Sequence, residues 1–245
     1  MKLCLFISYN KNQENFFKYD IPYLNCIRKY FDKVILVTNE KPKNYADECL
    51  IFENEGYDFG FFYKAINKID ISNYSSIAFI NNSNILVKNK NLDSIFSWSN
   101  KKSLDFWGIT DSIECPPGID PKKSYHIQSH FLVFENKSIP FIKEFFKHIN
   151  FESFFKISNV NKLRQSIINK CEIGITQYMI SKGLNVGSYF QYNVILNKYK
   201  KSLRSNMHVW LWEELIHDGY PLMKKKIKSG EWSFLPNHKN KNKYI

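Results

Sequence analysis

The sequence lacks long apolar segments, and no run approaches the roughly 20 residues that span a bilayer. Residues 1–7 are too short and too strand-like for a secretory signal. These absences argue against a membrane-spanning protein, and we expect a cytoplasmic one. The chain of 245 residues has 44% hydrophobic residues, which is enough to bury a large core.

Cysteine is scarce and scattered. The five cysteines, at positions 4, 26, 49, 115 and 171, are odd in number, and no pair has Cys-x-x-Cys spacing. Most of them lie within apolar segments. We therefore expect reduced core residues, and neither a disulfide framework nor a cysteine metal site.

Acidic residues are few relative to basic ones, with 23 Asp and Glu against 35 Lys and Arg, and the formal charge is +12. This charge favours an anionic partner such as a nucleoside diphosphate, a lipid phosphate or a membrane surface. Much of the excess lies in Lys224-Lys225-Lys226 and in residues 238–243, runs that we interpret as solvated surface. No nucleic-acid recognition motif accompanies them, so we expect no nucleic-acid partner.

Strand-like and helix-like segments alternate along the chain. Apolar runs predict strands over residues 2–8, 33–38, 49–52, 76–80, 104–109, 131–134 and 186–190. Helical spacing predicts helices over residues 14–31, 61–69, 92–98, 139–149, 160–168, 172–182 and 209–217. This alternation predicts a Rossmann-like α/β fold with a mostly parallel central sheet flanked by helices. We expect one domain over residues 1–237 and a basic, disordered tail over residues 238–245.

The stretch from Glu53 to Gly60 follows a predicted strand and opens a predicted helix. Free backbone N–H groups at such a helix start, at the carboxyl edge of a sheet, favour an anionic ligand. The alternative is an ordinary turn at Asn54-Glu55-Gly56 with Asp58 as a helix cap.

Further polar residues follow other predicted strands. Asn81-Asn82-Ser83 would face the same ligand crevice, although an Asn-rich turn explains it equally well. Residues 114–124 contain three prolines and predict a loop across the open edge, where they could form a lid. A lone His is more often a structural residue than a catalyst, but His126 and Gln128 share one face of an extended segment, which adds to the case for ligand contact.

Six blocks of the sequence resemble the rhamnan synthesis F family of bacterial polysaccharide-assembly glycosyltransferases. They are Glu53-Asn54-Glu55-Gly56-Tyr57-Asp58-Phe59-Gly60, Asn81-Asn82-Ser83, Phe106-Trp107-Gly108-Ile109-Thr110, residues 126–134, Glu172-Ile173-Gly174-Ile175-Thr176-Gln177-Tyr178, and residues 210–221. The blocks span nearly the whole chain. The resemblance implies a GT-A-like glycosyltransferase fold.

The resemblance also implies substrates and their contacts. The donor would be a nucleotide-sugar carrying rhamnose or another hexose. The acceptor would be a saccharide, lipid-linked, of an O-antigen, capsule or rhamnan, reached through peripheral contact with the inner face of the cytoplasmic membrane. Implied donor-binding residues are Ser8, Tyr9, Asn54, Glu55, Gly56, Asp58, Gly60, Asn81, Asn82 and Ser83. Implied acceptor-binding residues are Thr110, His126, Gln128 and Ser129.

The resemblance places a metal position at residues 81–83. GT-A enzymes usually hold Mg²⁺ or Mn²⁺ with an Asp-x-Asp motif, and the family usually has Asn-Asp-Ser there. This sequence has Asn81-Asn82-Ser83. An amide oxygen brings no charge, so we expect Asn82 and Ser83 to form a weak metal site or none, and positive side chains to neutralise the leaving diphosphate.

Glu172 is the candidate general base, and Asp111 is the alternative. Many inverting GT-A enzymes carry the base at the start of a helix that ends in Gly, and Gly183 places Glu172 at that start. The implied reaction is a single displacement at the anomeric carbon, with inversion. The alternative function is a non-catalytic nucleotide-sugar or saccharide-binding subunit of an assembly complex.

Overall fold

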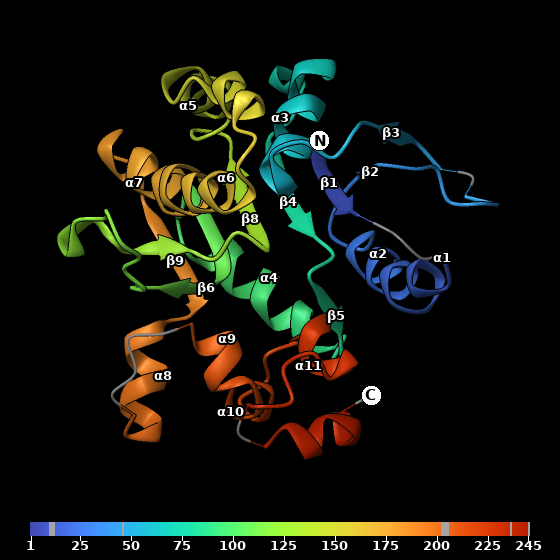
Figure 1. Ribbon diagram of the computed structural model, residues 1–245, viewed down its shortest axis with the longest axis vertical. Coiled ribbons are helices and arrows are strands. Elements are labelled where there is room, and N and C mark those ends of the chain that lie inside the picture. Colours follow the sequence, from blue (N-terminus) through green and yellow to red (C-terminus); the bar gives the residue numbers. More distant parts are fainter. Residues whose placement is uncertain (10–12, 46, 202–205, 236, 245) are drawn as a thin grey trace.

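The structure is a computed structural model that describes residues 1–9, 13–45, 47–201, 206–235 and 237–244. Its centre is an 8-stranded sheet in the order β3-β2-β1-β4-β8-β6-β7, with β9 beside β6 (Figure 1). The strands are β1 (Lys2–Ser8), β2 (Lys33–Thr38), β3 (Cys49–Ile51), β4 (Ser76–Asn81), β6 (Phe106–Ser112), β7 (His126–Ile127), β8 (Phe131–Glu135) and β9 (Val186–Phe190). The predicted mixed α/β fold with a mostly parallel central sheet is confirmed.

Strand directions place the polar strand ends together. β3, β2, β1 and β4 pair in parallel, and so do β6 and β9. β8 runs antiparallel to both β4 and β6, so it joins the two parallel groups. The carboxyl ends of β1, β4 and β6 therefore meet at one edge of the sheet.

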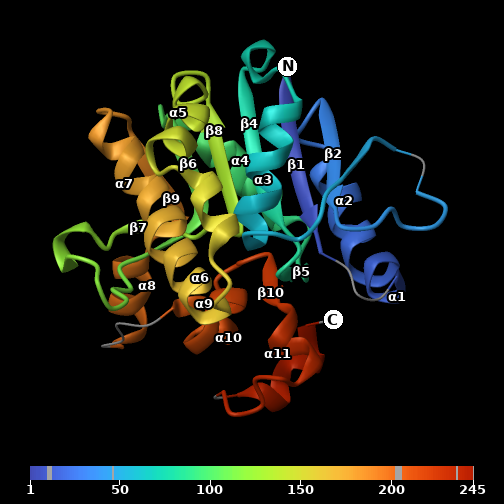
Figure 2. The same ribbon diagram turned by 45° about the horizontal axis from the view of Figure 1, so that its top comes forward.

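The two faces of the sheet bury alternate residues, because successive side chains of a strand point to opposite sides. Leu3, Leu5 and Ile7 of β1 join one hydrophobic core, whereas Cys4 and Phe6 join the other. The helices α3, α5, α6 and α7 cover the first face, as Figure 2 shows. The helices α2, α4, α8, α9 and α10 cover the second.

Most of the helices match predicted segments, but those at residues 71–73, 121–123, 151–156, 192–199, 225–229 and 238–244 were not predicted. Their bounds are α1 (Gln13–Asn15), η1 (Phe16–Asp20), α2 (Ile21–Ile27), α3 (Tyr57–Lys68), η2 (Ile71–Asn73), α4 (Asn91–Lys101), η3 (Pro121–Lys123), α5 (Pro140–His148), η4 (Phe151–Lys156), α6 (Val160–Ile167), η5 (Ile168–Ile173), α7 (Gly174–Ser181), α8 (Tyr192–Tyr199), α9 (Met207–Trp210), α10 (Trp212–His217), α11 (Lys225–Ser229) and η6 (His238–Tyr244). Within the described ranges, no helix is long and apolar enough to cross a bilayer.

The C-terminal elements lie beyond the carboxyl edge of the sheet. β10 (Leu222–Lys224) pairs antiparallel with β5 (Asn84–Leu86), which follows β4 directly. A third, smaller core that includes Ile85, Met223 and Ile227 holds this pair to α10 and α11. In Figure 1 the arrowheads of β1 and β4 point toward this part of the molecule.

Two segments differ from their predictions. Residues 172–182 are the end of a continuous helical run through α6, η5 and α7, so Glu172 does not begin a helix. Residues 238–244 form η6, where composition led us to expect no fixed structure. Asn240 Nδ2 and the Tyr244 hydroxyl donate hydrogen bonds to Glu213 Oε1 at 2.8 Å and 3.1 Å, contacts that a basic composition does not reveal.

Candidate functional site

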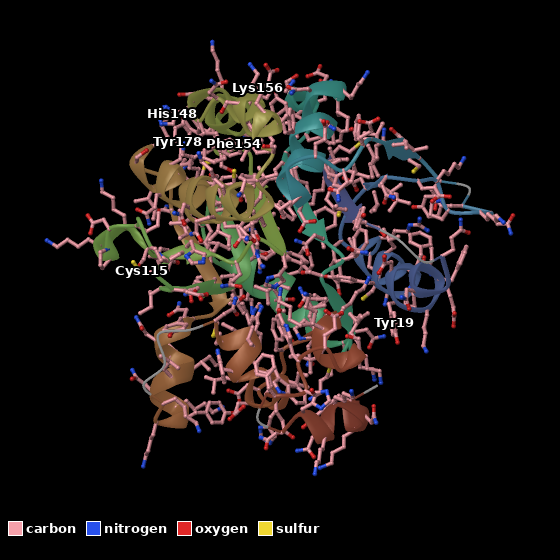
Figure 3. All side chains as sticks on the ribbon, in the orientation of Figure 1. Tyr19, Cys115, His148, Phe154, Lys156 and Tyr178 are labelled. Carbon is pink, nitrogen blue, oxygen red and sulfur yellow. The ribbon has the colours of Figure 1, made fainter. Side chains whose placement is uncertain are left out.

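A cleft of about 730 Å³ opens at the carboxyl edge of the sheet. Its walls come from the start of α3, the end of β4, the loop after β6, residues 126–130, one face of α6 and η5, and β10. The loop contributes Glu114 and Cys115, and Figure 3 labels Cys115 at the side of the molecule. The predicted residues Asp58, Asn81 and Glu172 line this cleft, and so do Ser83, His126, Gln128 and Ser129.

Two backbone features shape the start of α3. Gly56 and Tyr57 both have positive φ, +73° and +55°, a conformation that glycine adopts readily and tyrosine seldom does. A Cβ on Gly60 would lie 1.6 Å from the Glu55 carbonyl oxygen, so only glycine fits there. Gly56 and Gly60 thus shape the turn, and Asp58, which lies between them, lines the cleft.

Asp58 is held against the end of β4. Asn81 Nδ2 donates a hydrogen bond of 2.7 Å to Asp58 Oδ2. Burial raises the pKa of Asp58 from 3.8 to about 6, and the positive charge of Lys224 opposes this rise. The carboxyl group is therefore ionised at neutral pH, but its charge is poorly solvated.

Glu172 enters the cleft from η5, a π-helical segment between two α-helical ones. Such segments alter the direction of side chains within a helix and often occur at functional sites. Burial raises the pKa of the Glu172 carboxyl, as do the charges of Asp58 and Glu114. Lys224 and a hydrogen bond with Ser129 lower it. Glu172 is thus a partly desolvated carboxylate with a fixed partner.

The segment around β7 supplies neutral polar groups. His126 Nδ1–H donates to the Ser124 carbonyl oxygen at 2.7 Å, and burial lowers the pKa of His126, so its ring is neutral at pH 7. Gln128 Oε1 accepts a hydrogen bond of 3.1 Å from Asn206 Nδ2. These contacts fix both side chains at the cleft wall.

Lys224 was missed by the sequence analysis, which assigned its lysine run to solvated surface. It lies on β10, and its ammonium group is 3.4 Å from the Ser83 hydroxyl. Burial lowers the pKa of Lys224, while Glu172 and Asp58 raise it. The signal in the sequence is the position of the lysine run directly after the short apolar segment at residues 222–223, for which no strand was predicted.

A second, basic cavity of about 700 Å³ adjoins the cleft. Ser83, Arg164, Lys224 and Trp232 line both spaces and therefore lie at their boundary. The second cavity also includes Tyr9, Asn82, Lys225, Lys226 and Glu231. Cations outnumber acids on this side, although Lys225 pairs with Asp20 and Lys226 with Glu231. Asp58, Glu114 and Glu172 lie on the other side.

Asn82 belongs to a buried polar network. Its Nδ2 donates to Asp20 Oδ2 at 2.8 Å and to Ser8 Oγ at 3.2 Å, and Ser8 Oγ donates to the same Asp20 oxygen at 2.6 Å. Lys225 Nζ pairs with Asp20 Oδ1 at 2.6 Å. Ser8, a predicted donor-binding residue, is fully buried in this network and is not among the residues that line the main cleft.

Several other predicted residues lie outside the main cleft. Asp111, the alternative base, borders a separate cavity of about 260 Å³ and accepts a 2.6 Å hydrogen bond from the backbone N–H of Tyr192. Thr110 is buried, with its hydroxyl 2.6 Å from His208 Nε2. Asn54 is exposed, and Glu55 pairs with Lys64 at 2.6 Å.

Comparisons with known proteins place these features in context. The sequence matches the family model described as "Rhamnan synthesis protein F" over residues 34–241. No curated protein matches the chain.

Several solved structures resemble the chain at low identity. A glycosyltransferase involved in glycosylation of the major capsid of PBCV-1 is 10% identical, with a TM-score of 0.39 over 71% of this chain and 77% of that one. The inositol-1-phosphate CTP transferase from T. maritima is 11% identical, with a TM-score of 0.42 over 78% and 85%. The catalytic domain of Drosophila beta1,4galactosyltransferase 7 is 10% identical, with a TM-score of 0.38 over 76% and 64%.

Proposed function

The chain belongs to the rhamnan synthesis protein F family, and from this membership and its cleft we propose that it is a nucleotide-sugar-dependent glycosyltransferase. The observation that carries the proposal is the cleft itself, in which Glu172, Asp58 and Lys224 meet at the carboxyl edge of the sheet. A partly desolvated carboxylate beside a cation suits removal of a hydroxyl proton next to an anionic leaving group.

The substrates we propose follow the family resemblance. The donor carries rhamnose or another hexose, and the acceptor is a growing, lipid-linked cell-surface polysaccharide of the O-antigen, capsule or rhamnan type. A lipid-linked acceptor requires the enzyme to work at the inner face of the cytoplasmic membrane. The formal charge of +12 supports such contact, because anionic lipids attract basic proteins.

The reaction we propose is one in-line displacement. The Glu172 carboxylate takes the proton of an acceptor hydroxyl, and that oxygen forms a bond to the anomeric carbon of the donor. The bond from the anomeric carbon to the phosphate oxygen breaks, and the nucleoside diphosphate leaves with the electron pair. The anomeric configuration inverts. His126, Gln128 and Ser129 line the same cleft and are suited to hydrogen-bond sugar hydroxyls.

Donor turnover tests this function. Purified protein is incubated with dTDP-, UDP- and GDP-sugars, with and without a saccharide acceptor, and the released nucleoside diphosphate is measured. We expect one nucleotide class to be consumed, and faster with acceptor. A thermal melt with dTDP, UDP or GDP at millimolar concentration tests the donor site separately, because a ligand that binds the folded protein raises its melting temperature. If none of the three raises it, the donor-site assignment is wrong.

A non-catalytic binding subunit is the second candidate. The presence of Asn82 where the family usually has an acid favours it, because loss of a metal ligand is one route to loss of catalysis. Glu172, which lines the cleft together with Ser129, argues for the enzyme. Donor binding without hydrolysis or transfer, for any acceptor offered, would support the binding subunit.

A further inference from the structure

We infer that Lys224 supplies the positive charge that stabilises the departing diphosphate, so that this site works without a divalent cation. The inference rests on the proposed glycosyl transfer. It concerns the step at which negative charge develops on the leaving phosphate oxygen, where a fixed cation lowers the barrier most.

The residues at the expected metal position do not fit a metal ion. The Asn82 amide nitrogen donates to Asp20 and Ser8 in the buried network, and the amide oxygen, the one atom of this side chain able to ligate a hard cation, brings no charge. The Ser83 hydroxyl donates a 2.6 Å hydrogen bond to Asn81 Oδ1. Hard cations need several oxygen ligands with net negative charge. Among the residues that the structure describes, no group of three or more His, Cys, Asp or Glu side chains could hold a metal ion.

The backbone brings Lys224 to this position. The antiparallel pairing of β10 with β5 sets Lys224 opposite Asn84, and the Lys225 N–H donates to the Ser83 carbonyl oxygen at 2.9 Å. Lys224 Nζ then lies 3.4 Å from Ser83 Oγ, directly after the end of β4. The ammonium group therefore occupies the strand end at which a GT-A metal would be expected.

The charges on the two sides of Lys224 orient the donor. Glu172 and Asp58 line the cleft, and Lys225 and Lys226 line the basic cavity. A sugar awaiting attack belongs beside the carboxylates, and a diphosphate belongs among the cations. Lys224 lines both spaces, so the bond between the anomeric carbon and the phosphate oxygen would lie next to its ammonium group.

Arg164 supports the same orientation. It lies on α6, one helical segment before Glu172, and it also lines both spaces. A guanidinium group can hold two phosphate oxygens at once, which suits a second contact to the diphosphate. We assign Arg164 to binding the diphosphate and Lys224 to stabilising the leaving oxygen.

Calorimetric titration tests the inference. UDP, dTDP and GDP are titrated into wild-type protein in EDTA and in Mn²⁺, and the tightest ligand is then titrated into Lys224→Met, Lys224→Arg and Lys228→Met. Lys228 lies on α11 of the same segment and contacts Asn242, so its replacement removes one charge as a matched control. Circular dichroism melts check that each variant folds.

The expected results are specific. Wild-type affinity should be equal within about threefold in EDTA and in Mn²⁺, because a fixed ammonium group needs no metal. Lys224→Met should weaken binding on the order of ten- to hundredfold, as loss of a charge-assisted hydrogen bond does. Lys224→Arg should keep most of the affinity, and Lys228→Met should change it by less than about twofold.

Three outcomes overturn a claim, and they are distinguishable. Wild-type binding that requires Mn²⁺ would overturn the inference and leave the transferase function standing. Unchanged affinity in Lys224→Met would do the same. If no nucleoside diphosphate binds wild-type protein under either condition, the proposed function itself fails. The wild-type comparison holds even if a variant does not fold.

Discussion

At the scale of single residues, Glu172 decides between an enzyme and a binding subunit. Glu172→Gln keeps the size of the side chain and its contact with Ser129 but removes the proton acceptor. We expect turnover with saturating donor and acceptor to fall on the order of a hundredfold to ten-thousandfold. Donor binding, measured by calorimetry, should be retained.

The control is Glu144→Gln, which removes a carboxylate from the exposed face of α5, where Glu144 pairs with Lys182. Its turnover should equal that of the wild type. Near-normal turnover in Glu172→Gln would contradict the assignment. Asp58 would then be tested before Asp111, because Asp111 borders a different cavity and accepts the Tyr192 N–H.

Asp58 gives a prediction about pH and stability. Its folded-state pKa is raised to about 6 from 3.8, so the folded protein disfavours the ionised form. Ionisation as the pH rises through this window therefore lowers the free energy of unfolding. Asp58→Asn should increase that free energy by about 1–2 kcal/mol at pH 7.5 and have little effect near pH 4.

Urea denaturation at the two pH values measures this effect. Asp58→Asn should also lose donor turnover, because charged groups that lower the stability of a cleft are often needed for activity. A destabilised Asp58→Asn at pH 7.5 would mean that the hydrogen bond from Asn81 outweighs the cost of burying the charge.

At the scale of elements, the start of α3 depends on close packing at one glycine. A Cβ on Gly60 would lie 1.6 Å from the Glu55 carbonyl oxygen, whereas a Cβ on Gly183 meets nothing within 4 Å. Gly183 has a φ of +74°, so alanine there would cause backbone strain but no steric clash. We expect Gly60→Ala to lower the free energy of unfolding by about 3 kcal/mol or more, and Gly183→Ala by about 1 kcal/mol.

Urea denaturation of the two variants and the wild type provides the comparison. Equal effects would show that α3 shifts to relieve the contact. Gly60→Ala should also reduce donor binding if it folds, because α3 carries Asp58 into the cleft.

The strands that form the main sheet were largely predictable from sequence, and the reason is burial. β1 and β2 have the predicted bounds, because a strand buried on both faces is a short apolar run with clear ends. β9 also has the predicted bounds, although it is only partly buried. β5 and β10 were missed because each contributes three residues of which only two are apolar, whereas the equally short β3 is apolar throughout. The continuity of α6 with α7 through η5 was missed because a π-helical segment has no characteristic residue composition that would reveal it in the sequence.

The candidate site was predictable where its residues follow strands. Asp58 and Asn81 reach the cleft as expected, since strand ends and helix starts converge at the carboxyl edge. Glu172 also lines the cleft, but from within a continuous helical run and not from the predicted helix start. Lys224 was assigned to solvated surface because a run of three lysines resembles a solvated face. One of the three, Lys224, lines the cleft because β10 pairs with β5. These two strands are far apart in the chain, so the sequence does not reveal their pairing.

At the scale of the whole molecule, one ion pair joins the two ends of the fold. Asp20 is 1% exposed and pairs with Lys225 at 2.6 Å, 205 positions along the chain. Lys225→Met leaves the buried carboxylate without its cation, so we expect a loss of about 2–4 kcal/mol in the free energy of unfolding. Asp20→Asn combined with Lys225→Met should recover part of that loss.

A double-mutant cycle by urea denaturation measures the coupling, for which we expect about 1–3 kcal/mol. Lys33→Met, which breaks the exposed pair between Lys33 and Glu48, is the matched control and should cost less than about 1 kcal/mol. A coupling near zero would mean that Ser8 and Asn82 alone stabilise the Asp20 carboxylate.

The pairing of β10 with β5 also bears on how the protein is made. All the strands of the main sheet precede residue 191 in the chain, so the sheet can assemble on the ribosome before Lys224 emerges. The cleft gains Lys224 only when β10 reaches β5, late in synthesis. A nascent chain would thus acquire a stable sheet first and the means to hold a diphosphate last, so released fragments would be folded yet inert.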